Sequence, residues 1–439
     1  MEFKKITLTY VGVKGIVPER WTQIGDGQFR RASSENDPTM LFERAFAHVD
    51  CDVVKDVLAR EIGLDAFPEP VGTLDTGTRS WELYSFDHHF PYLGTLKSDF
   101  ALAQDGSWTY LVSLSTGPNE HNDLYDAVFI PVVKAFTPLN RQFGRLAGGV
   151  PDPSQGPTLA QQLGYGIDDI LVVVHADDVG YHLDQTDGVL AAMEIGMCKT
   201  GSVMVPCPDF ERVVSIWQKR PELDLGIHLT LNSEWGTQYG WSPILPESQV
   251  PSLYNPDGLM WGTEWELKEH VNVDEALMEI EAQILKVLEA GLTPTHVDEH
   301  MGCYWWNFDL TNGVMQLARK YNLCMLPVDI SKMRTMGYVF PDSFWQFASN
   351  MIGEEKGSTI RKKVYDDWLQ NLGPGVHQVM THIANVTEDY ASKVHGAHFR
   401  HGDYVYWISP ETKALAEALG ITFIGYRELR QLQAANWAC

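Results

Sequence analysis

The sequence lacks cysteine pairs of the Cys-x-x-Cys type, and it lacks long apolar runs. Its 439 residues include six cysteines, too few for a disulfide scaffold in a chain of this length. We expect free thiols in a reducing compartment, which makes the cytoplasm the predicted location. No window approaches the ~20 apolar residues of a membrane helix, and the N-terminus has neither the apolar core nor the cleavage site of a signal peptide.

Positive charge is also scarce. Lysine and arginine number 33 against 58 aspartates and glutamates, which gives a formal net charge of −25. Such a surface repels phosphate backbones and anionic lipids, so we expect neither a nucleic-acid partner nor a membrane partner. Hydrophobic residues at 44% and charged residues at 21% are ordinary for a globular protein and exclude a disordered or collagen-like chain.

A stretch rich in glycine and proline at 144–157 is the clearest boundary in the chain. It predicts a small accessory α+β domain over residues 1–143, a linker over 144–167 and a second domain over 168–439. In the first domain we expect the adjacent residues His88 and His89 to lie in a loop as solvated side chains, because they have no third ligand at a sensible spacing.

The second domain alternates between apolar strands and amphipathic helices. Its first strand, DILVVVHAD, is rich in β-branched residues, as expected for a strand buried on both faces. Repeated strand-helix units predict an α/β fold with a parallel sheet, and the 272 residues from Asp168 to Cys439 suit a (β/α) barrel of ~250 residues.

Four of the predicted strands end in imidazoles or carboxylates. These ends are the run from His175 to Asp178, then His228, then the run from His296 to His300, and finally His382. A single histidine at a strand end is more often a capping residue than a ligand. Catalytic groups of barrels project from the carboxyl ends of the strands, however, and four such ends on one rim indicate a site.

Two local patterns suggest chemistry. If their strand stays extended, His296, Asp298 and His300 share one face, and this N/O set favours Zn²⁺, Fe²⁺, Mn²⁺ or Co²⁺ and tolerates Mg²⁺. The adjacent carboxylates Asp177 and Asp178 suit different roles, one as metal ligand and the other as base. The alternative is that Asp178 only stabilises a turn.

The segments HADDVG, DLGIHLTL and PTHVDEH, followed by the closing strand ITFIGYREL, resemble the YdjC-like carbohydrate deacetylases, which include chitooligosaccharide deacetylase. The resemblance covers residues 168–432. It implies a (β/α) barrel related to other polysaccharide deacetylases. It also implies a divalent metal and a hydrolase that removes N-acetyl groups from a short amino-sugar oligomer.

The resemblance also implies roles for single residues. Matched motif by motif, the metal ligands are Asp178, His228 and His300, and the catalytic base is Asp177. His296 and Asp298 then support the ligands, and His382 is the candidate that protonates the departing amine. Zinc or magnesium is the expected metal, and manganese, cobalt and iron also fit the residue types.

The segment after His300 departs from the family pattern. It reads Met-Gly-Cys-Tyr-Trp-Trp, which puts the substrate in doubt more than the reaction. Trp305 and Trp306 are candidates for stacking on sugar rings, with packing of a satellite core as the alternative. We expect Cys303 to be a small residue beside the site rather than a metal ligand.

Two other functions fit the same pattern. One is a metal hydrolase of a different amide, an ester or a phosphoester, although no Lys/Arg-rich motif for phosphate stands beside the site. The other is a degenerate barrel that serves as a carbohydrate-binding or scaffold module. The expected partner is a small oligosaccharide, and a homodimer is the default oligomeric state.

Overall fold

The structure is a computed structural model of the chain. It describes residues 1–8, 12–25, 27–31, 37–47, 51–62, 64, 66–90, 94–105, 108–138, 156–327, 330–346, 357–394 and 396–438. These residues form two compact units, the first within 1–138 and the second within 156–438. The stretch at 144–157 lies mainly outside the described residues, so the linker and its boundaries stay a prediction.

The first unit combines two antiparallel sheets with short helices. The larger sheet has the order β3-β4-β5-β9-β8-β7-β6, and the smaller has the order β1-β2-β10. The strands are β1 (Phe3–Leu8), β2 (Val13–Pro18), β3 (Thr22–Gly25), β4 (Gln28–Arg30), β5 (Met40–Ala47), β6 (Gly72–Asp75), β7 (Ser80–Phe90), β8 (Gly94–Asp105), β9 (Trp108–Thr116) and β10 (Thr137–Pro138). The helices are α1 (Cys51–Glu61), α2 (His121–Leu124), a π-helical turn (Tyr125–Phe129) and α3 (Ile130–Ala135).

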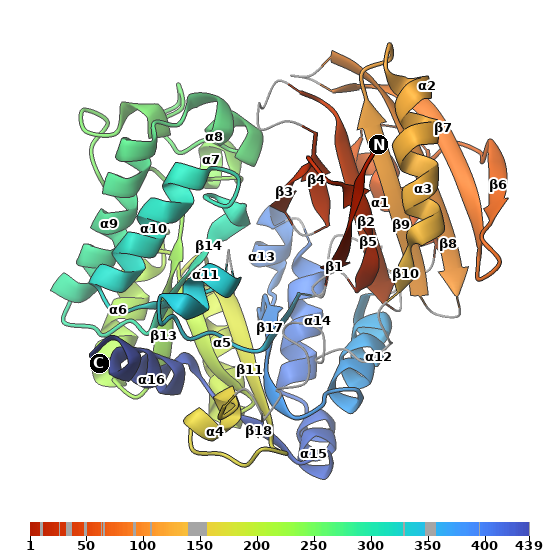
Figure 1. The fold of residues 1–439 in the computed structure, drawn as a ribbon. Coiled ribbons are helices and arrows are strands. Elements are labelled where there is room, and N and C mark those ends of the chain that lie inside the picture. The colour runs from red at the N-terminus through yellow and green to blue at the C-terminus, as the bar shows by residue number, and fades with distance from the viewer. Residues whose placement is uncertain are drawn as a thin grey trace. The chain divides into compact units, whose positions relative to one another are not determined.

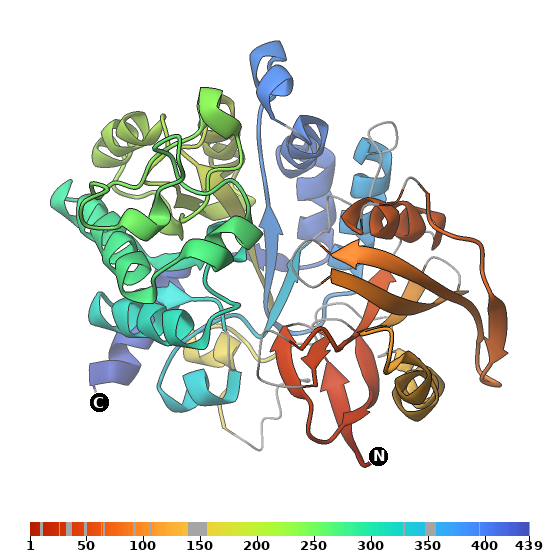
Figure 2. The same ribbon diagram turned by 90° about the horizontal axis from the view of Figure 1, so that it is seen from above.

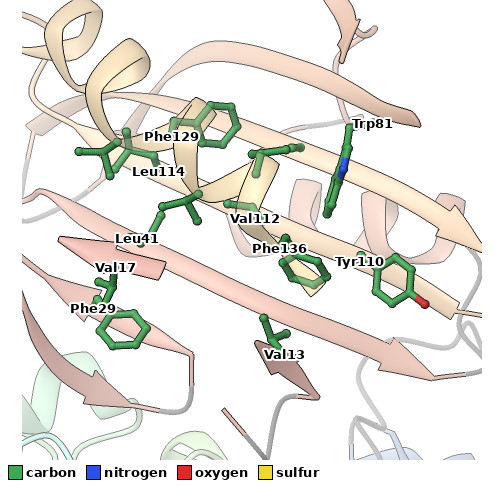
Figure 3. Packing of buried hydrophobic residues seen from close by; sticks show 14 of the residues in the cluster. Val13, Val17, Phe29, Leu41, Trp81, Tyr110, Val112, Leu114, Phe129 and Phe136 are labelled. Carbon is green, nitrogen blue, oxygen red and sulfur yellow. The ribbon is translucent and has the colours of Figure 1, made fainter. Parts of the chain in front are cut away.

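Both faces of the larger sheet are covered, and strand β9 contributes to both. Tyr110, Val112 and Leu114 alternate onto one face, where they pack with Phe129 in the cluster that Figure 3 shows. Leu111 points the other way, into a second cluster that includes residues of α1. This period of two is the side-chain pattern of an extended strand, and it gives the unit a hydrophobic core on each side of the sheet.

The predicted loop around His88 and His89 is wrong. Both residues lie in β7, where His88 pairs with Leu96 and His89 with Thr95 of β8. The polar run Asp-His-His resembles a turn in sequence, but the long ladder with β8 extends the strand through it. His88 is buried, and burial lowers the pKa of its imidazole.

The buried carboxyl group of Glu43 on β5 should make the stability of the first unit depend on pH. Its side chain is fully buried, and neither carboxylate oxygen has a hydrogen-bond partner among the described residues. Burial raises its pKa to about 8, so the folded unit favours the protonated form. The folded state then binds more protons than the unfolded state between about pH 4.5 and pH 8, and stability falls as pH rises through this window.

We expect the unfolding free energy of the wild type, relative to Glu43→Gln, to fall by about 2 to 5 kcal/mol across this window. Urea titrations of the full chain at several pH values, followed by hydrogen exchange of β5, would measure the difference. If the difference in unfolding free energy between the two proteins did not change from acid to alkaline pH, the Glu43 carboxyl would not be held in its neutral form.

The second unit is built on a parallel sheet. Its strands are β11 (Ile170–Val179), β12 (Cys198–Val203), β13 (Asp224–Leu229), β14 (His296–Glu299), β15 (Cys324–Met325), β16 (Ser343–Gln346), β17 (Gly375–Thr381) and β18 (Ile421–Phe423). The order is β15-β14-β13-β12-β11-β17-β16, with β18 also paired to β11. The predicted α/β fold with a parallel sheet is confirmed. No strand pairing in the described part of the chain joins β15 to β16, so closure into a barrel stays a prediction.

Helices follow most of these strands (Figures 1 and 2). They are α4 (Leu159–Gln162), α5 (Leu183–Ile195), α6 (Phe210–Lys219), α7 (Gly236–Tyr239), α8 (Glu264–His270), α9 (Val273–Glu289), α10 (Phe308–Lys320), α11 (Ile330–Thr335), α12 (Gly357–Gln370), α13 (Glu388–Lys393), α14 (Ala397–Trp407), α15 (Pro410–Ala418) and α16 (Tyr426–Ala438). Helices α9 and α10 pack against each other in Figure 1, and α12 and α14 lie side by side in Figure 2. Among the described residues, no helix has the length and apolar character to cross a membrane.

Candidate active site

The four polar strand ends belong to nearby strands of one parallel sheet. Strands β14, β13, β12, β11 and β17 follow one another in the sheet, so their carboxyl ends share an edge. His228 and Asp298 are direct neighbours in the register of β13 and β14. Gly226 on β13 makes room for a ring of this cluster, because a Cβ there would lie 2.5 Å from atoms of His296.

Strand β11 ends irregularly at the adjacent aspartates. Its register with β12 shifts between Ala176 and Val179, and Asp178 has a left-handed backbone with φ of 63°. Aspartate tolerates this conformation better than most residues, but the conformation still costs free energy, and such strain gathers at functional sites. The irregular end allows both Asp177 and Asp178 to face the same cluster, which a regular strand would prevent.

Asp178, His228 and His300 form a compact group of ligand type. One ligand atom of each lies within 4.8 Å of the other two, and all three residues are buried. Asp178 Oδ1 is 3.2 Å from His228 Nε2 and 3.3 Å from His300 Nδ1. Yet this oxygen has no hydrogen-bond partner among the described residues. A buried oxygen that lacks a hydrogen bond beside two imidazole nitrogens fits the donor set of a divalent metal.

The second nitrogen of each imidazole in this group faces a carboxylate. His228 Nδ1 lies 3.0 Å from Asp298 Oδ1, and His300 Nε2 lies 3.0 Å from Glu234 Oε2. Asp298 is held in turn by the Ser202 hydroxyl, which donates to its Oδ2 over 3.0 Å. Carboxylates in this position orient metal-binding histidines and increase their basicity, so the surroundings also fit a metal site.

The charges of the group favour protonated imidazoles when no metal is bound. Burial opposes a charge on His300, but Glu234 and Asp178 outweigh it and raise its pKa to about 9. Burial likewise opposes a charge on His228, while Asp298 and Asp178 raise its pKa well above the usual value. Metal binding must therefore displace protons, so metal affinity should fall at low pH.

Arg400 on α14 neutralises the other oxygen of Asp178. Its Nη1 donates to Asp178 Oδ2 over 2.6 Å and to Gln185 Oε1 over 3.3 Å. Although burial raises the pKa of Asp178, the Arg400 charge and the two histidines lower it well below the usual value. The carboxylate is thus ionised, with one oxygen bound to arginine and the other facing the imidazoles.

His382 stands at the end of β17 on the other side of the aspartates. Its Nε2 is 3.9 Å from Asp177 Oδ2 and also 3.9 Å from Asp178 Oδ2. Its backbone N–H donates to Asp403 on α14 over 3.0 Å, which fixes the chain at this point. Burial, together with the Arg400 charge, lowers the pKa of the imidazole.

The expected grouping of His296 and Asp298 with His300 on one strand face is wrong. Strand β14 ends at Glu299, and His300 begins a 3₁₀ turn, so the period of two does not reach it. His296 and Asp298 form a separate group with His175, while His300 joins Asp178 and His228. A third combination joins Asp177, His228 and Asp298, which leaves Asp177 as a rival ligand.

The predicted sugar-stacking residues lie just beyond His300. Trp305 and Trp306 are half-buried, and Lys268 Nζ lies 5.6 Å from the ring centre of Trp306. Trp241, which packs against the ring of His300 at 6.2 Å, is buried and donates to a backbone carbonyl, so it belongs to the wall of the site. Cys303 is buried, and its thiol donates to the Leu229 carbonyl rather than joining the ligand group.

A family model described as YdjC-like protein matches residues 171–418, which is more than half of the chain. The chain belongs to this family. The match covers β11, β13, β14 and β17 and so includes the candidate ligands, but not β18 or α16.

Relatives of this YdjC-like chain are named carbohydrate deacetylases. One from Enterococcus faecalis is 33% identical over 153 residues, or 35% of this chain and about half (56%) of that protein. Another, from Geobacillus stearothermophilus, is 27% identical over 268 residues, or 59% of this chain and 98% of that protein. A crystal structure from Enterococcus faecalis, described as a candidate cellobiose-phosphate cleavage protein, is 26% identical with a TM-score of 0.50. It covers 60% of this chain and 99% of that one.

Sequence reasoning missed several residues of the site in this YdjC-like chain. Arg400 lies 222 residues from its partner Asp178, and Glu234 lies 66 residues from His300. Neither stands at a strand end or in a motif, so no local pattern marks them. His175 carried a signal, because it precedes Asp177 by two residues on the same strand and shares its face.

Proposed function

We propose that this YdjC-like chain is a metal-dependent carbohydrate deacetylase that hydrolyses the N-acetyl groups of an amino-sugar oligosaccharide. The main support is the group of Asp178, His228 and His300, in which a buried carboxylate oxygen lies beside two imidazole nitrogens and has no hydrogen bond to any residue that the structure describes. The deacetylase names of the relatives support the class of reaction.

Asp178 Oδ1, His228 Nε2 and His300 Nδ1 would hold the metal. A divalent ion bound there supplies Lewis acidity for the acetyl carbonyl and lowers the pKa of a water. The N/O donor set suits zinc, manganese, cobalt or iron, and magnesium is tolerable. Zinc and magnesium are the first to test.

Asp177 and His382 would move the protons. Asp177 takes a proton from the water as the water oxygen bonds to the acetyl carbon, and the C–N bond then breaks to give acetate and the free amine. His382 Nε2, 3.9 Å from Asp177 Oδ2, is placed to pass a proton to the departing nitrogen. His296 and Asp298 support the geometry from the buried side.

Trp305 and Trp306 would bind the sugar. Both follow His300 directly, and aromatic faces stack well on sugar rings. A homodimer and a cytoplasmic location, both expected from the sequence, remain predictions.

The deciding experiment measures acetate release. We expect the purified full chain to release acetate from N-acetylated chitooligomers, to lose at least about 100-fold in rate after removal of its metal by a chelator, and to regain the rate with zinc or magnesium. The panel should include an acetylated ester and a cellobiose phosphate. Binding of the oligomers without turnover would favour a carbohydrate-binding module, and turnover of the ester or phosphate alone would favour another hydrolase.

A further inference from the structure

His175 lies beside the proposed base and has no part in the proposed proton transfers. It is a β11 residue with 1% of its side chain exposed. Its Nδ1 is 2.7 Å from Asp177 Oδ1, and its Nε2 is 2.6 Å from His296 Nε2. The Nε2 atoms of two buried imidazoles thus contact each other, and one of these rings also contacts the proposed base Asp177.

The hydrogen-bond partners of the two Nδ1 atoms, which point away from the other ring, indicate which of these nitrogens carry a hydrogen. The Asp177 carboxylate can only accept, so His175 Nδ1 carries a hydrogen. On the far side, the Thr295 hydroxyl donates to Asp224 Oδ1 over 2.5 Å and has no second hydrogen. With Asp224 ionised, the hydroxyl accepts from His296 Nδ1, which lies 2.9 Å away.

A neutral imidazole carries only one N–H. If both rings were neutral, two lone pairs would face each other at 2.6 Å, an arrangement that repels unless a cation lies between them. A tetrahedral zinc ion with Zn–N bonds of about 2.0–2.1 Å would hold the nitrogens about 3.3 Å apart. The distance of 2.6 Å is shorter than this spacing and fits a shared proton.

We propose that His175 and His296 share one proton between their Nε2 atoms, and that the resulting buried cation positions the side chain of Asp177, the proposed base. His175 is then a positioning residue. This inference rests on the proposed function in one respect, which is that Asp177 acts as the base of the deacetylase.

The surroundings of the pair suit a positive charge. Asp177 faces it from β11, and Asp298 faces it from β14, with Oδ2 3.7 Å from His175 Nε2. The ring of Tyr426 from α16 stacks on His296 at 4.1 Å, and His228 from β13 opposes the charge. Burial opposes it too, yet Asp298 and Asp177 raise the pKa of His175.

The His175 side of the pair favours the proton, because Asp177 and Asp298 both lie beside His175, while burial lowers the pKa of His296. Each of the two adjacent carboxylates then has its own buried cation. Arg400 holds Asp178 over 2.6 Å, and His175 holds Asp177 over 2.7 Å. This arrangement stabilises two neighbouring carboxylates. The second oxygen of Asp177, Oδ2, faces His382.

Nitrogen NMR of the zinc-loaded full chain, labelled with ¹⁵N at histidine, tests the protonation state directly. We expect both ring nitrogens of His175 to be protonated at about pH 8, where an ordinary imidazole with a pKa of about 6.5 has lost one proton. His296→Gln supplies a neutral N–H donor at the same place, so His175 Nε2 should then lose its proton. An unprotonated His175 Nε2 in the wild type, or a second bound zinc that His296→Gln removes, would overturn the proposal.

Kinetics test the positioning role separately. His175→Asn keeps an N–H for Asp177 but cannot hold the proton, and we expect kcat to fall about 10- to 100-fold with KM and metal content unchanged. An unaltered kcat and pH profile in a folded variant would refute the positioning role. The NMR result does not depend on turnover, so failure of the deacetylase proposal and failure of the shared proton remain distinguishable.

Discussion

Replacing Asp178 by asparagine is expected to remove the metal and, with it, the deacetylase activity. The change keeps the side-chain shape and a residue that tolerates the left-handed backbone, where φ is 63°. It replaces the charged oxygen between His228 and His300 by a neutral group, so the ligand set loses its only carboxylate. We expect metal affinity to fall by more than about 100-fold, the upper range for loss of an outer partner of a ligand.

The activity should fall by at least about 1,000-fold, which corresponds to about 4 kcal/mol of transition-state stabilisation. Metal analysis by mass spectrometry and acetate release from the same preparation measure both effects. Asp169→Asn is the matched control, because Asp169 stands just before the opposite end of β11 and its carboxylate accepts only the Gly166 N–H in the described structure. Wild-type metal content and turnover in Asp178→Asn would show that Asp178 is no ligand.

The sequence predicted which residues lie together at this site, because the carboxyl ends of strands in a parallel sheet share one edge. Asp178, His228 and His300 could be named on that basis together with the family resemblance, and the structure brings them together. His300 shows the limit of strand periodicity. It was expected to share a face with His296, but the strand stops one residue before it.

The rest of the site depends on contacts that no local pattern encodes. Arg400 reaches Asp178 from α14, and Asp403, one turn further along the same helix, holds the backbone of His382. A helix that serves two strand ends in this way is visible only after the chain has folded. The two edge strands of the sheet are similarly hard to recognise in the sequence, because β15 has two residues and β16 has four, too few to show a pattern.

Replacing Asp177 by asparagine is expected to lower kcat while the metal stays bound. The amide cannot take a proton from the attacking water, and loss of a general base costs about 100- to 10,000-fold in rate. KM should change little, because the substituted group has the same size. Rate and metal content are again measured on one sample, so that Asp177→Asn can be set beside Asp178→Asn.

The comparison decides between two ligand sets that the structure allows. Asp177 lies near His228 and Asp298 in one combination of ligand atoms, and that combination would make it a ligand. Its Oδ1, however, is already bonded to His175 over 2.7 Å, while Asp178 Oδ1 has no hydrogen bond in the described structure. We therefore expect the metal to depend on Asp178 and the rate to depend on both residues. Equal loss of metal in the two variants would move Asp177 into the ligand set and leave the base to be sought at His382.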